Sequence, residues 1–357
     1  MAHHTRRRFL KETVAFSASI LLERSSLAQY VAGTGNAAFE GAPDSYHLFA
    51  LGDWGTDTHS HQAAVSHAMQ AYAATNRIHP KCLLFLGDNW YGWLFGGSAS
   101  KRWRTQFEEM YPADVFPGKC FAILGNHDYE HRPGDKVAAQ LEYAKKPGTR
   151  WTLPSKWYSF AVPEARPLIR FIALDSNYPE RDFFRTTPAL TRDEIAAQNA
   201  WFQQQLAAPT QAPFTIVIAH HPIFSNGDHG DTPALIRDWR HALNEHRVPL
   251  YLCGHDHDLQ HLEFAGDPTS YVVSGGGGAV LRNMHSRHRN EDVYGRKVAG
   301  FTHIEANNDN LIVRLVDSSG TIVHSFSKQQ TRTIADPGRV SGHDSAVLSA
   351  IGLEAVP

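Results

Sequence analysis

A short apolar run that ends at a glycine and passes directly into potential metal ligands occurs at Leu83-Leu84-Phe85-Leu86-Gly87-Asp88-Asn89-Trp90-Tyr91. Short apolar runs that end in this way are typical of buried strands. The same pattern occurs in three other places, which end in Gly52-Asp53-Trp54-Gly55, Gly125-Asn126-His127-Asp128 and Gly254-His255-Asp256-His257, and a fifth run passes into polar residues without a glycine, at Ala219-His220-His221-Pro222. Because ligands of α/β sheets bind just beyond the carboxyl ends of strands, the five segments predict one common site.

The elements between these segments favour an α/β fold with mixed sheets. Apolar residues at helical spacing predict helices over 61–78, 100–110, 191–207 and 232–245. The third helix has a capping box, with Thr191 as the N-cap and Glu194 three residues later. Further strands are predicted at 168–174 and 214–219, and after residue 270 only strands, at 271–273, 301–305, 311–316 and 321–326. Alternating strands and helices with a β-rich end predict stacked mixed sheets covered by helices.

Composition and length bound the kind of protein. The chain has 357 residues, of which 42% are hydrophobic and 20% charged, as in an ordinary soluble globular protein. We expect one catalytic domain over 47–328, preceded by a linker at 29–46 and followed by a loosely attached tail at 329–357. The net charge of -2 gives no polybasic surface, so nucleic acid is not a favoured partner.

The amino terminus resembles an export signal. Thr5-Arg6-Arg7-Arg8-Phe9-Leu10-Lys11 matches the twin-arginine pattern, residues 13–22 are weakly apolar, and Ser26-Leu27-Ala28 offers a cleavage site. A disordered basic terminus or a eukaryotic transit peptide is the alternative. We expect a signal peptide at 1–28 that is read by the twin-arginine export machinery of a bacterium. The mature protein would be periplasmic or secreted, without stable membrane insertion, since residues 13–22 are too few to span a bilayer.

The three cysteines are expected to be small core residues. Cys82, Cys120 and Cys253 each lie in or beside a predicted strand, and three cysteines cannot form a disulfide framework.

The polar residues of the five segments suit two cations. If Asp88 bridges, one cation can take Asp53, Asp88, Tyr91 and His257, and the other Asp88, Asn126, His220 and His255. A phenolate such as Tyr91 favours Fe(III), and the nitrogen and oxygen donors of the second set suit Fe, Zn or Mn. Asp128 could orient His127. An extended backbone at 254–257 would turn both imidazoles to the same side.

Several of these stretches also resemble a known family. Gly87-Asp88-x-x-Tyr91, Tyr251-Leu252-Cys253-Gly254-His255-Asp256-His257, the run at 201–208 and Tyr271-Val272-Val273-Ser274-Gly275 are similar to the calcineurin-like metallophosphoesterases. Among these, the chain resembles the purple acid phosphatases of the short, tartrate-resistant type, over about residues 47–280. The resemblance implies a four-layer α/β/β/α sandwich of two mixed sheets flanked by helices. It also implies a centre of Fe(III) plus a divalent ion, at which a metal-bound hydroxide attacks a phosphomonoester.

The resemblance assigns further histidines to the substrate. His127 would contact the phosphate or protonate the leaving group, and His229 would assist it. His221 stands where the animal enzymes have tyrosine, so the substrate side could differ there. Gly275 to Gly278 form either a mobile loop near the site or a tight turn. The alternatives are a phosphodiesterase acting on cyclic nucleotides or phospholipid headgroups, and a non-catalytic secreted metal-binding protein.

Overall fold

The computed structural model describes residues 29–30, 45–56, 60–130, 135–178, 190–288 and 292–330. The predicted signal peptide at 1–28 and most of the predicted tail lie outside these residues. Of the predicted linker, Gln29–Tyr30 form strand β1, Tyr46 begins β2, and 31–44 lie outside the described residues. The predicted tail begins inside a strand, because β15 extends to Gln329. In the described part of the chain, no helix has both the length and the apolar character needed to cross a bilayer.

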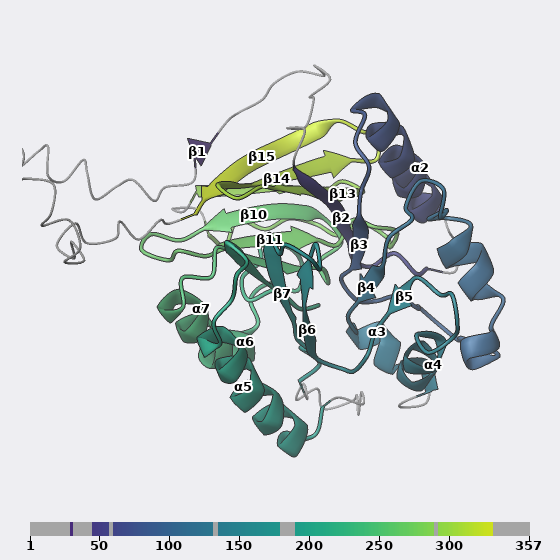
Figure 1. Ribbon diagram of the computed structural model, residues 1–357, viewed down its shortest axis with the longest axis horizontal. Coiled ribbons are helices and arrows are strands. Elements are labelled where there is room, and N and C mark those ends of the chain that lie inside the picture. Colours follow the sequence, from purple (N-terminus) through teal and green to yellow (C-terminus); the bar gives the residue numbers. More distant parts are fainter. Residues whose placement is uncertain are drawn as a thin grey trace, which may run out of the picture.

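Two mixed sheets form the centre of the molecule (Figure 1). In the first sheet, β2 to β5 are parallel and the remaining strands pair antiparallel. The strands of this sheet are, in spatial order, β1 (Gln29–Tyr30), β15 (Ile322–Gln329), β14 (Asn310–Asp317), β13 (Gly300–Ala306), β2 (Tyr46–Leu51), β3 (Cys82–Phe85), β4 (Cys120–Ala122) and β5 (Trp151–Thr152).

The second sheet has a parallel centre with antiparallel strands at its edges. Its strands are, in spatial order, β12 (Asp292–Arg296), β10 (Leu259–Glu263), β11 (Ser270–Ser274), β9 (Leu250–Cys253), β8 (Phe214–Ile218), β7 (Ile169–Ala173) and β6 (Tyr158–Val162). The two sheets are joined where the backbone nitrogen of Gly52, just after β2, donates to the carbonyl of Ser274 at 2.8 Å.

Helices cover the outer faces of both sheets (Figure 1). The predicted capping box at the start of α5 is confirmed, since the Thr191 hydroxyl accepts from the backbone nitrogen of Glu194 at 3.2 Å and Glu194 Oε2 accepts from that of Thr191 at 2.8 Å. The helical elements are α2 (Ser60–Thr75), η1 (Gly97–Ala99), η2 (Trp103–Glu108), α3 (Asn126–Tyr129), α4 (Asp135–Tyr143), α5 (Arg192–Ala207), α6 (Pro233–Leu235), η3 (Ile236–Arg240) and α7 (His241–Glu245).

Side-chain alternation along the strands divides the core into layers. In β8, Ile216 and Ile218 are buried in the cluster that also holds Phe49 and Phe85 of the first sheet. Val217 points the other way, into a second buried cluster formed with residues of α5 and η3. A strand that is buried on both faces needs a helical layer outside it. The predicted four-layer α/β/β/α sandwich is therefore confirmed.

The cysteines behave as expected. Cys82, Cys120 and Cys253 are buried and unpaired, and burial raises the pKa of the Cys82 and Cys120 thiols to about 12. They act as small core residues.

Candidate metal centre

Backbone contacts hold the five polar segments together beyond the carboxyl ends of β2, β3, β4, β8 and β9. The backbone nitrogen of Asp53 donates to the carbonyl of Gly87 at 3.0 Å, and that of Gly254 donates to the carbonyl of His220 at 3.0 Å. The fit is close at Gly125, where a Cβ would lie 2.2 Å from Oδ1 of Asp88. The segments therefore meet at one point, as the strand-end pattern predicts.

Three residues of the site have a left-handed backbone. The φ angles of Asp53, Asp88 and His255 are 60°, 53° and 73°. Such conformations cost non-glycine residues about 1–3 kcal/mol each and are typical of functional sites. The backbone at 254–257 is not extended, so the condition under which both imidazoles would share one side is not met. The turn at His255 directs its imidazole and that of His257 to different sides of the site.

The first group of side chains lies around the phenolic oxygen of Tyr91. This oxygen is 3.2 Å from Oδ1 of Asp53, 3.0 Å from Oδ2 of Asp88 and 3.1 Å from Nε2 of His257. His257 Nε2 is itself 3.5 Å from Asp53 Oδ1. Asp53, Asp88 and His257 are buried, and their ligand atoms are close enough together to hold one metal ion.

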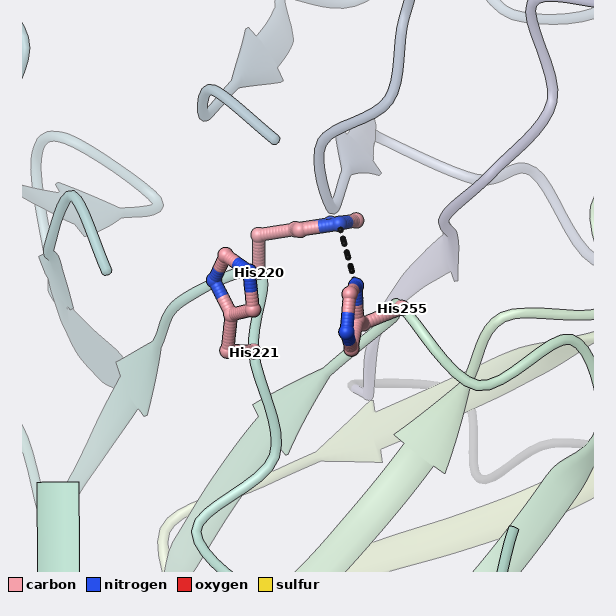
Figure 2. Close-up of side chains that lie close together, drawn as sticks. All are labelled: His220, His221 and His255. Carbon is pink, nitrogen blue, oxygen red and sulfur yellow. Dashed lines mark hydrogen bonds between the residues drawn. The ribbon is translucent and has the colours of Figure 1, made fainter. Parts of the chain in front are cut away.

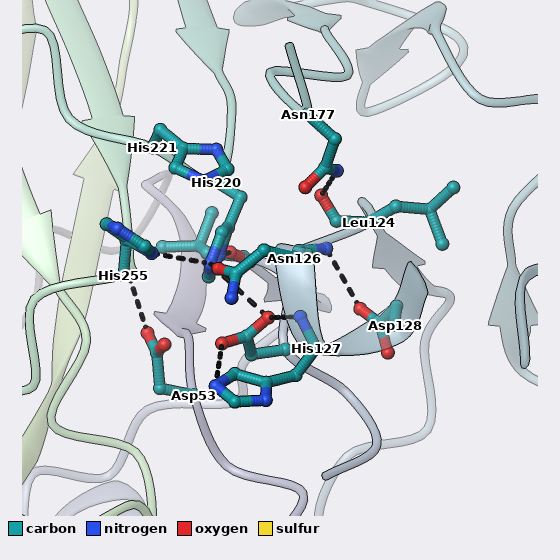
Figure 3. A network of polar contacts seen from close by, with 12 residues as sticks. Asp53, Leu124, Asn126, His127, Asp128, Asn177, His220, His221 and His255 are labelled. Carbon is teal, nitrogen blue, oxygen red and sulfur yellow. Dashed lines mark hydrogen bonds and ion pairs between the residues drawn. The ribbon is translucent and has the colours of Figure 1, made fainter. Parts of the chain in front are cut away.

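The second group lies around Nε2 of His220. This nitrogen is 3.1 Å from Oδ1 of Asn126, 3.3 Å from Nδ1 of His255 and 3.4 Å from Oδ1 of Asp88. Figure 2 shows His220, His221 and His255 gathered together, and these three residues could also hold a metal ion. Figure 3 shows Asn126 among them, with Asp53 and His127 beside the group.

Asp88 belongs to both groups. Its Oδ2 lies beside Tyr91 and its Oδ1 beside His220, so one carboxylate faces the two groups with different oxygens. The structure thus brings together all seven residues predicted as ligands, in the two predicted sets.

The electrostatics of the site favour positive charge. Burial opposes protonation of His220, yet the carboxylate of Asp88 raises the pKa of this imidazole to about 10. Burial and the neighbouring histidines keep the pKa of His255 well below its usual range, so this imidazole is neutral. Burial and the charges of Asp88 and Asp53 raise the pKa of Tyr91 well above its usual range. Two buried carboxylates beside imidazoles, an amide oxygen and a phenol form a donor set that fits a pair of hard or borderline cations, and such cations would take the place of the protons that the carboxylates favour on His220 and His257.

His127 lies at the edge of the first group. Its ring centroid is 4.1 Å from that of Tyr91, and its backbone nitrogen donates to Asp88 Oδ1 at 2.8 Å. Its Nδ1 is paired with Oε2 of Glu130 at 2.7 Å, so Glu130 orients this imidazole. The expectation that Asp128 would do so was wrong. Asp128 is fully buried and accepts hydrogen bonds from backbone nitrogens of the second and third segments instead.

The other two predicted substrate histidines lie on the side of His255. The ring of His229 is 4.1 Å from that of His255 and exposed, which suits contact with a bound molecule. His221 is buried 4.3 Å from the same ring, and its Nδ1 pairs with the hydroxyl of Ser176 at 2.8 Å. Its place in the cation-capable group gives it a second possible role, as a ligand.

Asp256 is a site residue that the sequence did not single out. Its Oδ1 accepts a hydrogen bond from the backbone nitrogen of His229 at 3.0 Å, and its Oδ2 accepts one from the hydroxyl of Ser225. It therefore ties the fifth segment to the loop that carries His229. Only its position between two histidines could have drawn attention to it.

The glycine run lies against the first segment. The backbone nitrogen of Gly277 donates to the carbonyl of Gly52 at 3.1 Å. At Gly275, a Cβ would lie 2.0 Å from the carbonyl oxygen of Asp256 and 2.9 Å from Oδ2 of Asp53. Proximity to the site is confirmed, and the reason for glycine is close approach of the backbone.

Comparison with known proteins agrees with this geometry. The family described as calcineurin-like phosphoesterase matches residues 51–259. Tartrate-resistant acid phosphatase type 5 of Rattus norvegicus is 30% identical over 298 residues, covering 78% of this chain and 89% of that protein. Purple acid phosphatase 17 of Arabidopsis thaliana is 26% identical over 303 residues, covering 80% of this chain and 85% of that protein.

Solved structures share the fold. The purple acid phosphatase PPD1 from yellow lupin (Lupinus luteus) seeds matches with a TM-score of 0.59 and 18% identity, covering 81% of this chain and 54% of that one. GAP50, the anchor in the inner membrane complex of Plasmodium, matches with a TM-score of 0.65 and 21% identity, covering 81% and 90%. The chain therefore belongs to the calcineurin-like phosphoesterases, a family of hydrolases, and to their branch of tartrate-resistant and purple acid phosphatases.

Proposed function

We propose that the protein is an exported acid phosphatase that hydrolyses phosphomonoesters at a dinuclear metal centre. The single observation that carries the proposal is the carboxylate of Asp88, which faces Tyr91 with one oxygen and His220 with the other. One cation would be held by Asp53, Asp88, Tyr91 and His257, and the second by Asp88, Asn126, His220 and His255. The phenol favours Fe(III) in the first position, and Fe, Zn or Mn suits the second.

When bound, such a pair of cations supplies Lewis acidity to the phosphoryl oxygens and makes hydroxide available as a nucleophile at mildly acidic pH. The remaining chemistry belongs to side chains at the rim. His127 is partly exposed, is oriented by Glu130, and lies beside Tyr91, so its imidazole can protonate the leaving oxygen. His229 lies beside His255, whereas His127 lies beside Tyr91, and His229 would bind the phosphate. His221 is buried beside the same His255 ring and would support this side of the substrate site.

The runner-up function is hydrolysis of phosphodiesters at the same centre. A panel of monoesters (4-nitrophenyl phosphate, phosphotyrosine, glycerol 2-phosphate) and diesters (bis-4-nitrophenyl phosphate, cyclic AMP, glycerophosphocholine) separates the two. We expect release of inorganic phosphate from monoesters at acidic pH, with monoesters preferred at least tenfold. A preference for diesters would support the runner-up, and no turnover by the metal-loaded protein would support a non-catalytic metal-binding role.

Export is a separate part of the proposal. It rests on the twin-arginine pattern at Arg6-Arg7-Arg8-Phe9-Leu10-Lys11. Replacing Arg6 and Arg7 by lysine in the full chain should leave the protein inside a bacterial host, whereas the unchanged chain reaches the periplasm or medium. Export of both chains alike would contradict the assignment.

A further inference from the structure

The segment that follows the glycine run, residues 280–288, forms hydrogen bonds with His257 of the first group of predicted ligands. The carbonyl of Val280 accepts a hydrogen bond from Nδ1 of His257 at 2.7 Å, and the backbone nitrogen of Arg282 donates to the carbonyl of His257 at 3.3 Å. The side chain of Val280 is 81% exposed. This segment therefore reaches the surface directly beside the predicted cation ligand His257.

The same segment also forms hydrogen bonds with the loop that carries His229. The backbone nitrogen of Asn283 donates to Oδ2 of Asp228 at 3.0 Å, and that of His285 donates to the carbonyl of Asn226 at 2.6 Å. His285 Nε2 also pairs with Oδ1 of Asp228 at 2.6 Å. Arg282 thus lies between Val280, which is bound to His257, and Asn283, which is bound to Asp228 in the loop that carries His229.

The side chain of Arg282 lacks the partners that its neighbours have. Its Nε is buried and has no hydrogen-bond partner. Among the residues that the structure describes, no carboxylate forms an ion pair with its guanidinium. Arg287, by contrast, donates to the carbonyl of Gly227. A buried donor without a partner is costly, so an unpaired one beside a site indicates a missing acceptor.

The charge of Arg282 reaches the site. Burial lowers the pKa of His229, Asp256 opposes that effect, and the positive charge of Arg282 adds to the lowering. The same charge also acts on His257, on the other side of the site. The backbone bonds of Arg282 to His257 and of Asn283 to Asp228 place Arg282 between the predicted cation ligand His257 and the loop that carries the predicted substrate histidine His229.

We propose that Arg282 is a further substrate-binding residue, whose guanidinium donates hydrogen bonds to the phosphate of the substrate. Arginine offers planar paired donors that match phosphate oxygens, and the charge-assisted bonds are strong where water is scarce. The inference rests on the proposed function, since it assigns a residue to the substrate of that same site. It adds a guanidinium, with its paired donors, to the imidazoles already predicted to contact the substrate.

The test measures binding of inorganic phosphate to the metal-loaded protein by calorimetry, beside kcat, KM and metal content. We expect Arg282→Gln to weaken phosphate binding about tenfold or more, to raise KM similarly and to leave metal content unchanged. Arg282→Lys should recover only part of the loss. Arg287→Gln controls for loosening of the segment, and Arg296→Gln, on the exposed part of β12, controls for loss of one positive charge.

Unchanged phosphate binding in Arg282→Gln would overturn the proposal, as would an equal loss in Arg287→Gln or Arg296→Gln. Loss of metal from Arg282→Gln would also overturn it, because Arg282 would then support His257 rather than bind the substrate. A wild-type protein that binds phosphate but hydrolyses no monoester refutes the proposed function alone, since the binding comparison still decides the role of Arg282.

Discussion

The backbone nitrogen of His255 donates a hydrogen bond to Oδ2 of Asp53 at 2.8 Å, across 202 positions of sequence. The first and fifth segments are thus joined by a residue that is also a predicted metal ligand. The other oxygen of the same carboxylate, Oδ1, faces Tyr91 and His257. Asp53 therefore has two separable roles, one in holding the segments and one in binding a cation.

Two substitutions of Asp53 should separate these roles. Asp53→Asn keeps an oxygen that accepts from His255 but removes the charge, so we expect loss of metal and of activity with little change in metal-free stability. Asp53→Ala removes the acceptor as well and should cost about 1–3 kcal/mol more in the free energy of unfolding. Urea denaturation of the metal-free proteins measures the difference. Equal stability of the two variants would show that the hydrogen bond does not matter.

Asp128 is predicted to matter as a scaffold residue. Its Oδ2 accepts from the backbone nitrogen of Gly125 at 2.9 Å and its Oδ1 from that of Trp90 at 3.0 Å. Asp128→Asn turns an acceptor into a donor against these nitrogens, so we expect a loss of about 1–3 kcal/mol in stability together with weaker metal binding. Thermal denaturation and metal analysis check this, with Asp135→Asn at the exposed start of α4 as the control. A variant as stable as the control would refute the scaffold role.

His127 should act on the leaving group. In His127→Ala we expect kcat to fall about 10²-fold for an alkyl phosphate, whose leaving oxygen needs a proton, and much less for 4-nitrophenyl phosphate. Steady-state kinetics on both substrates measures the contrast, and His67→Ala on the exposed face of α2 is the control. An equal fall for both substrates would instead assign His127 to phosphate binding.

The pH dependence of stability should report on a buried histidine pair between the strands β10 and β15. His261 Nδ1 and His324 Nε2 are 2.8 Å apart, and His261 Nε2 pairs with Glu263. Burial, and then the charge of His261, lowers the pKa of His324 to about 3. Between about pH 6.5 and about pH 3, the imidazole of His324 is protonated in the unfolded state but neutral in the folded state. The free energy of unfolding is therefore unaffected by this group at neutral pH and falls as the pH drops below about 6.5.

His324→Phe should flatten that loss. We expect a shallower fall of Tm between pH 7 and 4 than in the unchanged protein, even though His261 loses its partner and the variant is less stable at pH 7. His241→Gln, an exposed position, provides the comparison. Parallel curves of Tm against pH for the two variants would contradict the assignment.

The fold and the predicted ligands follow from local patterns. A short apolar run predicts a buried strand, and polar residues directly after the run mark the end of that strand. The place of Asp53, Asp88 and His220 at the carboxyl ends of strands was therefore predictable. Thr191 and Glu194 were predictable for a similar reason, since a capping box is defined within four residues. Five strands escaped notice, β1, β5, β6, β10 and β12. Strands β1 and β5 have only two residues each, β10 follows the last segment directly, and β12 is short and rich in polar residues.

The contacts that were missed depend on the path of the chain after each strand. Asp128 and Glu130 both lie near His127 in sequence, and only the turn of α3 decides that Glu130 reaches its imidazole. The left-handed backbone at His255 is imposed by packing of the fifth segment on Asp53, which no local pattern records. Arg282 lies in an irregular segment, whose direction is set by bonds to His257 and Asp228.

The central claim is that seven side chains from five segments bind two cations, one of them Fe(III) held by Tyr91. Metal analysis together with the visible spectrum of the natively purified protein tests it most directly, with Tyr91→Phe as the matched variant. We predict two metal ions per chain, at least one of them iron, and a purple absorption band that is absent from Tyr91→Phe. A folded, colourless protein without iron, or a band that persists in Tyr91→Phe, would contradict the account.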